Sequence, residues 1–285
     1  MCGIFNLLLY TYFMRYLIIA SLCLFSCLTA EVKMAIDIGS GKIKMQVASM
    51  QAESPLLCKL VPILNAGTPT LTDDEKISIE LRETILAHLL NLKAEANNFH
   101  PSKSQAVATE LFRKAVNGKE TAEYLEKESG IPIRIISQEE EGILGFISVT
   151  EEAHLDPEKV VVWDIGSGSF QITCKTLDKF VVHKSPAAQY DLIESLKNID
   201  PLIKDKLKQN KNAIIAIGRH PRCLLENKKK YSLDDVKEAL KNLHAQDQNF
   251  DELVVIQNVM QALCIHEVIY IGTAAGNTTA LLITE

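Results

Sequence analysis

The chain has no large excess of charge of either sign and no long basic segment. Its 30 Lys and Arg residues against 36 Asp and Glu residues give a net charge of −6. The basic run from Lys228 to Lys230 is short and is typical of a solvated turn before a helix. A surface that follows the phosphates of a nucleic acid needs clustered Lys and Arg, so we predict no nucleic-acid partner.

The cysteines show no metal-binding spacing. Beyond residue 30 the sequence has Cys58, Cys174, Cys223 and Cys264, which are widely separated. This excludes the paired cysteines of zinc ribbons and similar sites. Cys58 and Cys174 lie in apolar, strand-like runs, which predicts that they are small core residues. The sequence does not pair the four cysteines.

No apolar run is long enough for a confident membrane span, which needs ~20 residues. The longest candidate, Leu17 to Ala30, follows Arg15 and ends in small residues. A basic flank, an apolar middle and a small-residue end predict a signal peptide over residues 1–30, and therefore export to the periplasm. Two alternatives stay open: an uncleaved membrane anchor, and a lipoprotein acylated at Cys27, which would attach the chain to a membrane through lipid.

Two matching glycine-rich turns are the most informative motifs in the chain. They are Asp37-Ile-Gly39-Ser40-Gly41 and Asp164-Ile-Gly166-Ser167-Gly168, each placed between two strand-like apolar runs. Glycine and serine allow a phosphate to approach main-chain N–H groups closely. Two such hairpin tips in one chain predict a phosphate clamp built from related halves.

The order of the expected elements repeats. Each half reads as a three-strand meander followed by helices alternating with strands, which predicts an α/β duplication of mixed sheets with flanking helices and a cleft between the halves. The polar stretch from Thr150 to Glu158, which contains Pro157, is the expected boundary between domains over residues 31–155 and 156–285. Thr72 to Glu75 has the spacing of a capping box and predicts the start of a long helix.

Four blocks, in order, resemble the exopolyphosphatase and guanosine pentaphosphate phosphohydrolase (Ppx/GppA) family of the actin/hexokinase superfamily. Two are the loops that begin at Asp37 and Asp164. The others are Ala108-Thr-Glu-Leu-Phe-Arg113-Lys-Ala and Gly130-Ile-Pro-Ile-Arg-Ile-Ile-Ser-Gln-Glu-Glu-Glu141-Gly. The resemblance implies ribonuclease-H-like, actin-like domains and a phosphoanhydride hydrolase.

Hydrolysis of a phosphoanhydride requires donors for the oxygens, an oriented water and neutralised charge. Asp37 and Asp164 suit Mg²⁺ or another divalent cation. The resemblance places a catalytic glutamate at Glu141, whose alternative role is a helix N-terminal charge. Arg113 can match phosphate oxygens with its guanidinium, or be a surface arginine. The predicted phosphate-binding residues are Gly39, Ser40, Gly41, Lys42, Gly166, Ser167, Gly168 and Ser169, and Lys44 shares a strand face with Lys42.

The sequence departs from the family at two informative places. Gln171 replaces an expected glutamate, and Gly218-Arg219-His220 replaces a later glycine-rich segment. The leading hypothesis is an exported hydrolase of polyphosphate or a guanosine polyphosphate. The two departures favour its main alternative, a weak or inactive binding protein for the same ligands. A kinase or ATPase of the wider superfamily is a third, less favoured alternative. The sequence leaves open whether the protein forms a homodimer.

Overall fold

The computed structural model describes most of the chain beyond residue 30. The described residues are 31–49, 55–63, 71–166, 169–177, 179–186, 189–211, 213–218, 224, 229–244, 247, 250–272 and 276–284. The predictions for residues 1–30 and for Ser167, Gly168, Arg219 and His220 lie outside these ranges. Within them, the helices are too short or too polar to cross a bilayer.

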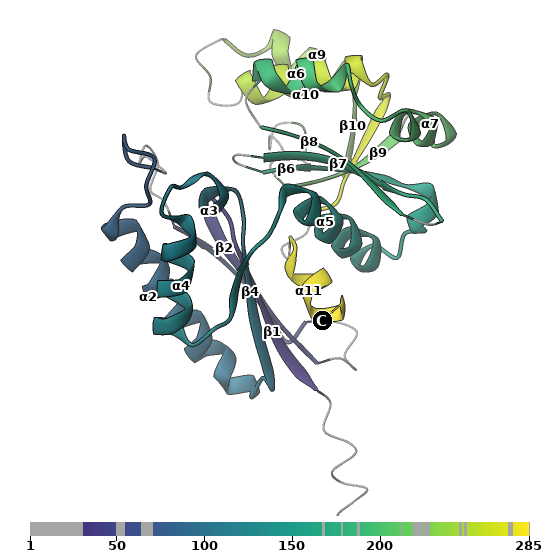
Figure 1. Cartoon of the computed structure of the whole chain (residues 1–285). Helices are drawn as coiled ribbons and strands as arrows, with labels where there is room; N and C mark the ends of the chain where they lie inside the picture. The colour runs from purple at the N-terminus through teal and green to yellow at the C-terminus, as the bar shows by residue number, and fades with distance from the viewer. Residues whose placement is uncertain are drawn as a thin grey trace, which may run out of the picture.

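The first sheet has the strand order β3-β2-β1-β4-β5, of which β2, β1 and β4 are labelled in Figure 1. β1 pairs antiparallel with β2 and parallel with β4. Helices α2, α3 and α4 belong to this half of the chain. The strands are β1 (Val32–Ile38), β2 (Lys42–Ser49), β3 (Leu57–Pro62), β4 (Lys103–Ala108) and β5 (Ile133–Ile135), and the helices are α2 (Ile79–Ala96), η1 (Asn97–Phe99), α3 (Glu110–Lys114) and α4 (Gly118–Ser129).

The second sheet repeats this order as β8-β7-β6-β9-β11, with β10 added at the edge. β6 again pairs antiparallel with the strand that follows and parallel with β9. The strands are β6 (Val161–Ile165), β7 (Ser169–Lys175), β8 (Phe180–Pro186), β9 (Ala213–Gly218), β10 (Lys230–Ser232) and β11 (Glu267–Tyr270). The helices are η2 (Pro157–Lys159), α6 (Gln189–Leu196), α7 (Pro201–Gln209), α9 (Leu233–Lys241) and α10 (Phe250–Ala262). The repeated topology confirms the predicted duplicated α/β fold.

Two helices, α5 (Gln138–Glu152) and α11 (Thr278–Thr284), lie between the sheets (Figure 1). Leu144 of α5 packs with Leu281 of α11 and with Ala35 of the first sheet. Phe146, on another side of α5, packs against Val162 of the second sheet. The helix that carries Glu141 is therefore fixed by both halves. The domain boundary near residue 155 stays a prediction.

Two helices show which polar residues cap a helix start. Ser232 and Asp235 form a capping box at the start of α9. The predicted capping box at Thr72 is wrong, because Ser78 caps α2 by accepting from the N–H of Leu81. Thr72 instead closes a turn onto Lys76 through its side chain and main chain, and Glu75 within this turn has a φ of 57°.

The two cysteines that were expected in strands differ in burial. Cys174 is buried, as predicted, but Cys58 is exposed because every second residue of β3 faces outward. The strand assignment of Cys58 was correct, and the prediction that it belongs to the core was wrong. Alternation along a strand at the edge of a sheet leaves one face open, which an apolar run alone does not reveal.

Gly118, the first residue of α4, is packed against main chain. A Cβ built on Gly118 would lie 1.9 Å from the carbonyl oxygen of Phe112. We expect Gly118→Ala to lower the free energy of unfolding by ~1–3 kcal/mol, the usual cost of overpacking, because the main chain at Phe112 must move. Urea denaturation measures this change. Lys119→Ala, on the exposed side of the same turn, is the control and should change stability by less than ~0.5 kcal/mol; equal stabilities of the two variants would contradict the prediction.

Candidate functional site

Both glycine-rich turns close in the same way. The N–H of Gly39 donates to the carbonyl of Lys42 at 3.0 Å, and the N–H of Gly166 donates to the carbonyl of Ser169 at 2.8 Å. A Cβ on either glycine would lie 3.1–3.2 Å from the nearest atom of its own hairpin. These two amides are thus used within the turns, and amide donors to a phosphate must come from the residues that follow them.

The loop aspartates occupy equivalent positions in the two sheets, but their cross-strand neighbours differ. Asp37 is opposite Lys44, whereas Asp164 is opposite Gln171. The Nζ of Lys44 lies 3.9 Å from Oδ2 of Asp37. Lys44 is therefore the nearer cation to the first loop, whereas Lys42 is exposed. The sequence signal for Lys44 is alternation along β2, which puts it on the same strand face as Lys42, although only Lys42 is among the predicted phosphate-binding residues.

Burial dominates the electrostatics of both aspartates. The loss of hydration raises the pKa of Asp37, and the charges of Lys44 and Arg113 and hydrogen bonds from Asn277 oppose this effect. Burial also raises the pKa of Asp164 to about 6; the charge of Lys44 lowers it and the charge of Asp37 raises it further. Because the charge of Asp37 acts on the pKa of Asp164, the two loops bring their carboxyl groups into one electrostatic site.

Glu141 lies in the first turn of α5, where Ser137 caps the helix. Its Oε2 accepts a hydrogen bond from Arg113 at 2.7 Å, and its Oε1 is 3.4 Å from the hydroxyl of Ser169, which donates to it. The side chain therefore connects α3 of the first half with the start of β7 in the second half. Only 8% of Glu141 is exposed, so its carboxylate is an interior group rather than a solvated helix charge.

Burial raises the pKa of Glu141 to about 7. The charge and hydrogen bond of Arg113 lower this pKa, and the charges of Asp164 and Asp37 raise it. A carboxylate whose pKa lies close to neutrality can take up a proton during a reaction, as a general base requires. The neighbouring Glu139 and Glu140 form ion pairs near the surface with Lys184 and Arg134, as expected for helix charges.

Arg113 is held in place from three sides and is not a surface arginine. Its NH2 group contacts Oε2 of Glu110 and Oε2 of Glu141, each at 2.7 Å, and its NH1 group donates to the carbonyl of Ile136 at 3.0 Å. The side chain of Arg113 is 17% exposed. The guanidinium group of Arg113, fixed in this way, presents a positive charge next to the Glu141 carboxylate.

The aspartates fit a divalent cation. Oδ1 of Asp37 is buried and has no hydrogen-bond partner among the described residues, whereas Oδ2 accepts from Asn277 at 3.2 Å. The part of the chain that the structure describes contains no group of three or more His, Cys, Asp or Glu residues arranged around a metal. A site with few carboxylates is nevertheless the kind that Mg²⁺ occupies, because that ion retains several waters.

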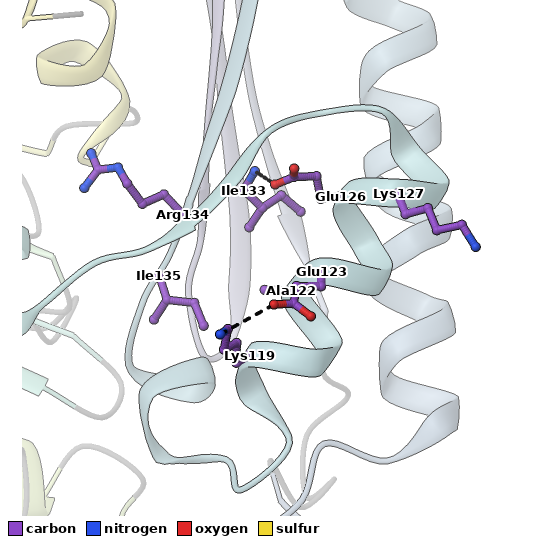
Figure 2. A pocket seen from close by; sticks show the side chains of 8 residues that line it. All are labelled: Lys119, Ala122, Glu123, Glu126, Lys127, Ile133, Arg134 and Ile135. Carbon is purple, nitrogen blue, oxygen red and sulfur yellow. Dashed lines mark hydrogen bonds and ion pairs between the residues drawn. The ribbon is translucent and has the colours of Figure 1, made fainter.

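Sequence reasoning missed Asn277, which precedes α11 and donates to Asp37 across 240 positions of the chain. No local motif marks it. The structure also has a surface pocket of about 520 Å³ between α4 and β5, whose lining includes Lys119, Glu126 and Arg134 (Figure 2). None of the predicted site residues lines this pocket.

Comparison with solved structures shows where this fold occurs. The Ppx/GppA enzyme of Aquifex aeolicus superposes with a TM-score of 0.68 at 18% identity, covering 90% of this chain and 100% of that one. An exopolyphosphatase from Cytophaga hutchinsonii gives a TM-score of 0.68 at 15% identity, with coverages of 89% and 97%. The model of the Ppx/GppA phosphatase family matches residues 64–215, which is more than half of the sequence and includes α3, α5 and the second loop. The chain therefore belongs to the Ppx/GppA phosphatase family.

Proposed function

We propose that the protein is an exported phosphohydrolase that removes terminal phosphate from polyphosphate or a guanosine polyphosphate by water attack. Export to the periplasm is part of this proposal and derives from the sequence of residues 1–30. The observation that carries the reaction is the buried contact of Glu141 with Arg113 and Ser169. It joins a base of suitable pKa to a guanidinium, at the junction of the two halves.

Glu141 accepts the proton of the attacking water. Its pKa of about 7 means that a large fraction is ionised at neutral pH, and that the protonated form is also accessible after the reaction. The fork of Arg113 orients the carboxylate and faces the negative charge that develops on the transferring phosphoryl group. Ser169 restricts the other carboxylate oxygen, so that the base keeps one position.

The hairpin tips hold the phosphate oxygens. Since the amides of Gly39 and Gly166 close their own turns, the predicted donors are the amides and hydroxyl groups of the tip residues that follow. The ammonium group of Lys44 adds positive charge beside Asp37. Asp37 and Asp164 would hold Mg²⁺, which supplies charge neutralisation for the phosphate chain when bound.

A second candidate function is binding without turnover, and Gln171 is the observation that favours it. Gln171 is 1% exposed and stands opposite Asp164. Neither polar atom of its side chain has a hydrogen-bond partner among the described residues. An amide in this position removes one negative charge from the site and weakens the attraction for a cation.

Two measurements on the purified protein separate these functions. Phosphate release from polyphosphate or guanosine pentaphosphate, with Mg²⁺ present, is expected for the phosphohydrolase. Calorimetric titration with the same ligands measures binding. If the protein binds these ligands but releases no phosphate, and circular dichroism shows that it is folded, the protein is a binding protein and not a hydrolase. The absence of both would reject the proposal.

The pKa of Glu141 predicts the pH dependence of the reaction. A general base must be deprotonated, so kcat/KM should rise with pH up to about 7 and then level off. Below that pH, each unit should lower kcat/KM by about tenfold, since kcat/KM reports the ionisation of the free enzyme. Initial rates of phosphate release across the pH range give this profile. A fall in kcat/KM that is centred near the ordinary pKa of a glutamate would contradict the buried environment assigned to Glu141.

A further inference from the structure

The side chain of Asn277 has an unused oxygen inside the carboxylate site. Asn277 is 4% exposed, and its Oδ1 has no hydrogen-bond partner among the described residues. Its Nδ2 group donates to Oδ2 of Asp37 at 3.2 Å, which assigns the amide nitrogen to Asp37 and turns the oxygen elsewhere. A buried acceptor without a donor costs free energy, which calls for a ligand that compensates it.

Helix capping does not explain this orientation. Asn277 stands directly before α11, and its carbonyl accepts from the N–H of Leu281. An asparagine at a helix start commonly uses its side-chain oxygen to accept a main-chain N–H of the first turn. Here Oδ1 accepts no hydrogen bond from any residue that the structure describes, so the amide group serves the site rather than the helix.

Oδ1 of Asn277 and the carboxylate of Asp164 both lie beside Gly145 of α5. A Cβ built on Gly145 of α5 would lie 3.1 Å from Oδ2 of Asp164 and 3.7 Å from Oδ1 of Asn277. The Nδ2 group of the same Asn277 amide donates to Oδ2 of Asp37. Oδ1 of Asp37 also has no hydrogen-bond partner among the described residues. Oxygens from β6 and from the residue before α11 thus lie beside Gly145, which lacks a side chain, and Asn277 connects them to Asp37 of β1.

We propose that Asn277 is the third protein ligand of a divalent cation held by Asp37 and Asp164. Carboxylate and amide oxygens are suitable ligands for a hard cation such as Mg²⁺, and waters or phosphate oxygens complete the shell. Asn277 supplies an oxygen ligand to a site in which the residue opposite Asp164 is Gln171 rather than a carboxylate. This inference rests on the proposed phosphohydrolase function, but it concerns metal binding and can be tested without a substrate.

The competing explanation is that Lys44 supplies the positive charge and that no divalent cation binds. The Nζ of Lys44 contacts Oδ2 of Asp37 at 3.9 Å, and Oδ1 of Asp37 has no hydrogen-bond partner within the described ranges. A lysine in this role predicts no response to Mg²⁺. It also predicts that substitutions at Asn277 affect only the stability of the fold.

Magnesium titration of the full chain, without phosphate ligands, distinguishes these explanations. Trp163, the single tryptophan, directly precedes Asp164 on β6, so its fluorescence reports on the strand that carries this ligand, and calorimetry gives an independent Kd. We expect Asn277→Leu to weaken Mg²⁺ binding at least about tenfold, the loss that even outer-shell partners of a metal produce. We expect Asn277→Asp to strengthen it by a similar factor, because a third carboxylate adds attraction for the cation.

The opposite sign of the two effects makes the test specific. If Asn277 only donates to Asp37, Asn277→Leu would also weaken Mg²⁺ binding. In that case an aspartate at position 277 would repel Asp37, and Asn277→Asp would weaken binding instead of strengthening it. Asn98→Leu and Asn98→Asp are matched controls, since Asn98 is exposed in η1 and should leave the Kd unchanged. An unchanged Kd for Asn277→Leu, weaker binding by Asn277→Asp, or no wild-type response by either method would overturn the proposal. This titration contains no phosphate ligand. A lack of phosphate release in the separate activity assay would therefore contradict the proposed function and not the metal site.

Discussion

Phosphate release by Glu141→Gln should be about 10²- to 10⁴-fold slower than by the wild-type protein, the range that general acid–base catalysis contributes. Glutamine keeps the size of the side chain and one oxygen for Arg113, but it cannot accept the proton of a water. Glu141 is 8% exposed and has a pKa raised to about 7 by burial, which is the property that the proposed reaction uses. Release rates at saturating polyphosphate and Mg²⁺ measure the effect.

Glu139→Gln is the matched control. Glu139 lies two residues earlier in the same helical turn and forms a 3.4 Å ion pair with Lys184 near the surface. We expect this variant to retain wild-type release within about twofold, because exposed ion pairs contribute little. Polyphosphate binding should persist in Glu141→Gln. Equal release by the wild type and Glu141→Gln would remove Glu141 from the role of base.

Replacement of Arg113 should produce the largest loss of stability among the site residues. Arg113→Met would leave the carboxylates of Glu110 and Glu141, whose side chains are 12% and 10% exposed, without their shared cation. Removal of one partner from a buried pair typically costs ~3–5 kcal/mol. The loss should depend on pH. Arg113 lowers the pKa of Glu141, so in its absence this pKa rises further above that of the unfolded chain.

The sign of the pH effect follows from proton binding. A glutamate with a raised pKa in the folded state binds more protons there than when unfolded, so its contribution is most favourable at low pH and is lost as pH rises through the folded pKa. Arg113→Met should therefore be more destabilised at about pH 8 than at about pH 5.5, as measured by urea unfolding. Arg134→Met, which breaks the exposed pair with Glu140, should change stability by ~0–1 kcal/mol. A pH-independent loss in Arg113→Met would contradict this account.

Local signals in the sequence predicted much of the fold but not the exact element boundaries. The alternation of apolar strands and the two Asp-Ile-Gly-Ser turns were sufficient to identify a duplicated α/β fold, which the repeated strand order confirms. The start of α2 was placed too early, because Thr72 has the spacing of a capping residue, while its hydroxyl bonds the N–H of Lys76 within a turn. Short polar side chains can stabilise either structure, and only the packing of the following residues selects one.

By itself the sequence determined the residue types and their order: two loop aspartates, a glutamate in the first turn of a helix after a capping serine, and an arginine shortly before. These depend on short-range spacing, which a local motif records. Only the tertiary structure decided that Arg113 contacts Glu141, that Lys44 lies beside Asp37, and that Asn277 closes the site from the far end of the chain. The physical reason is that burial and charge depend on which surfaces pack together. The placement of α5 and α11 between the two sheets removes these carboxylates from water, and no spacing in the sequence encodes that placement.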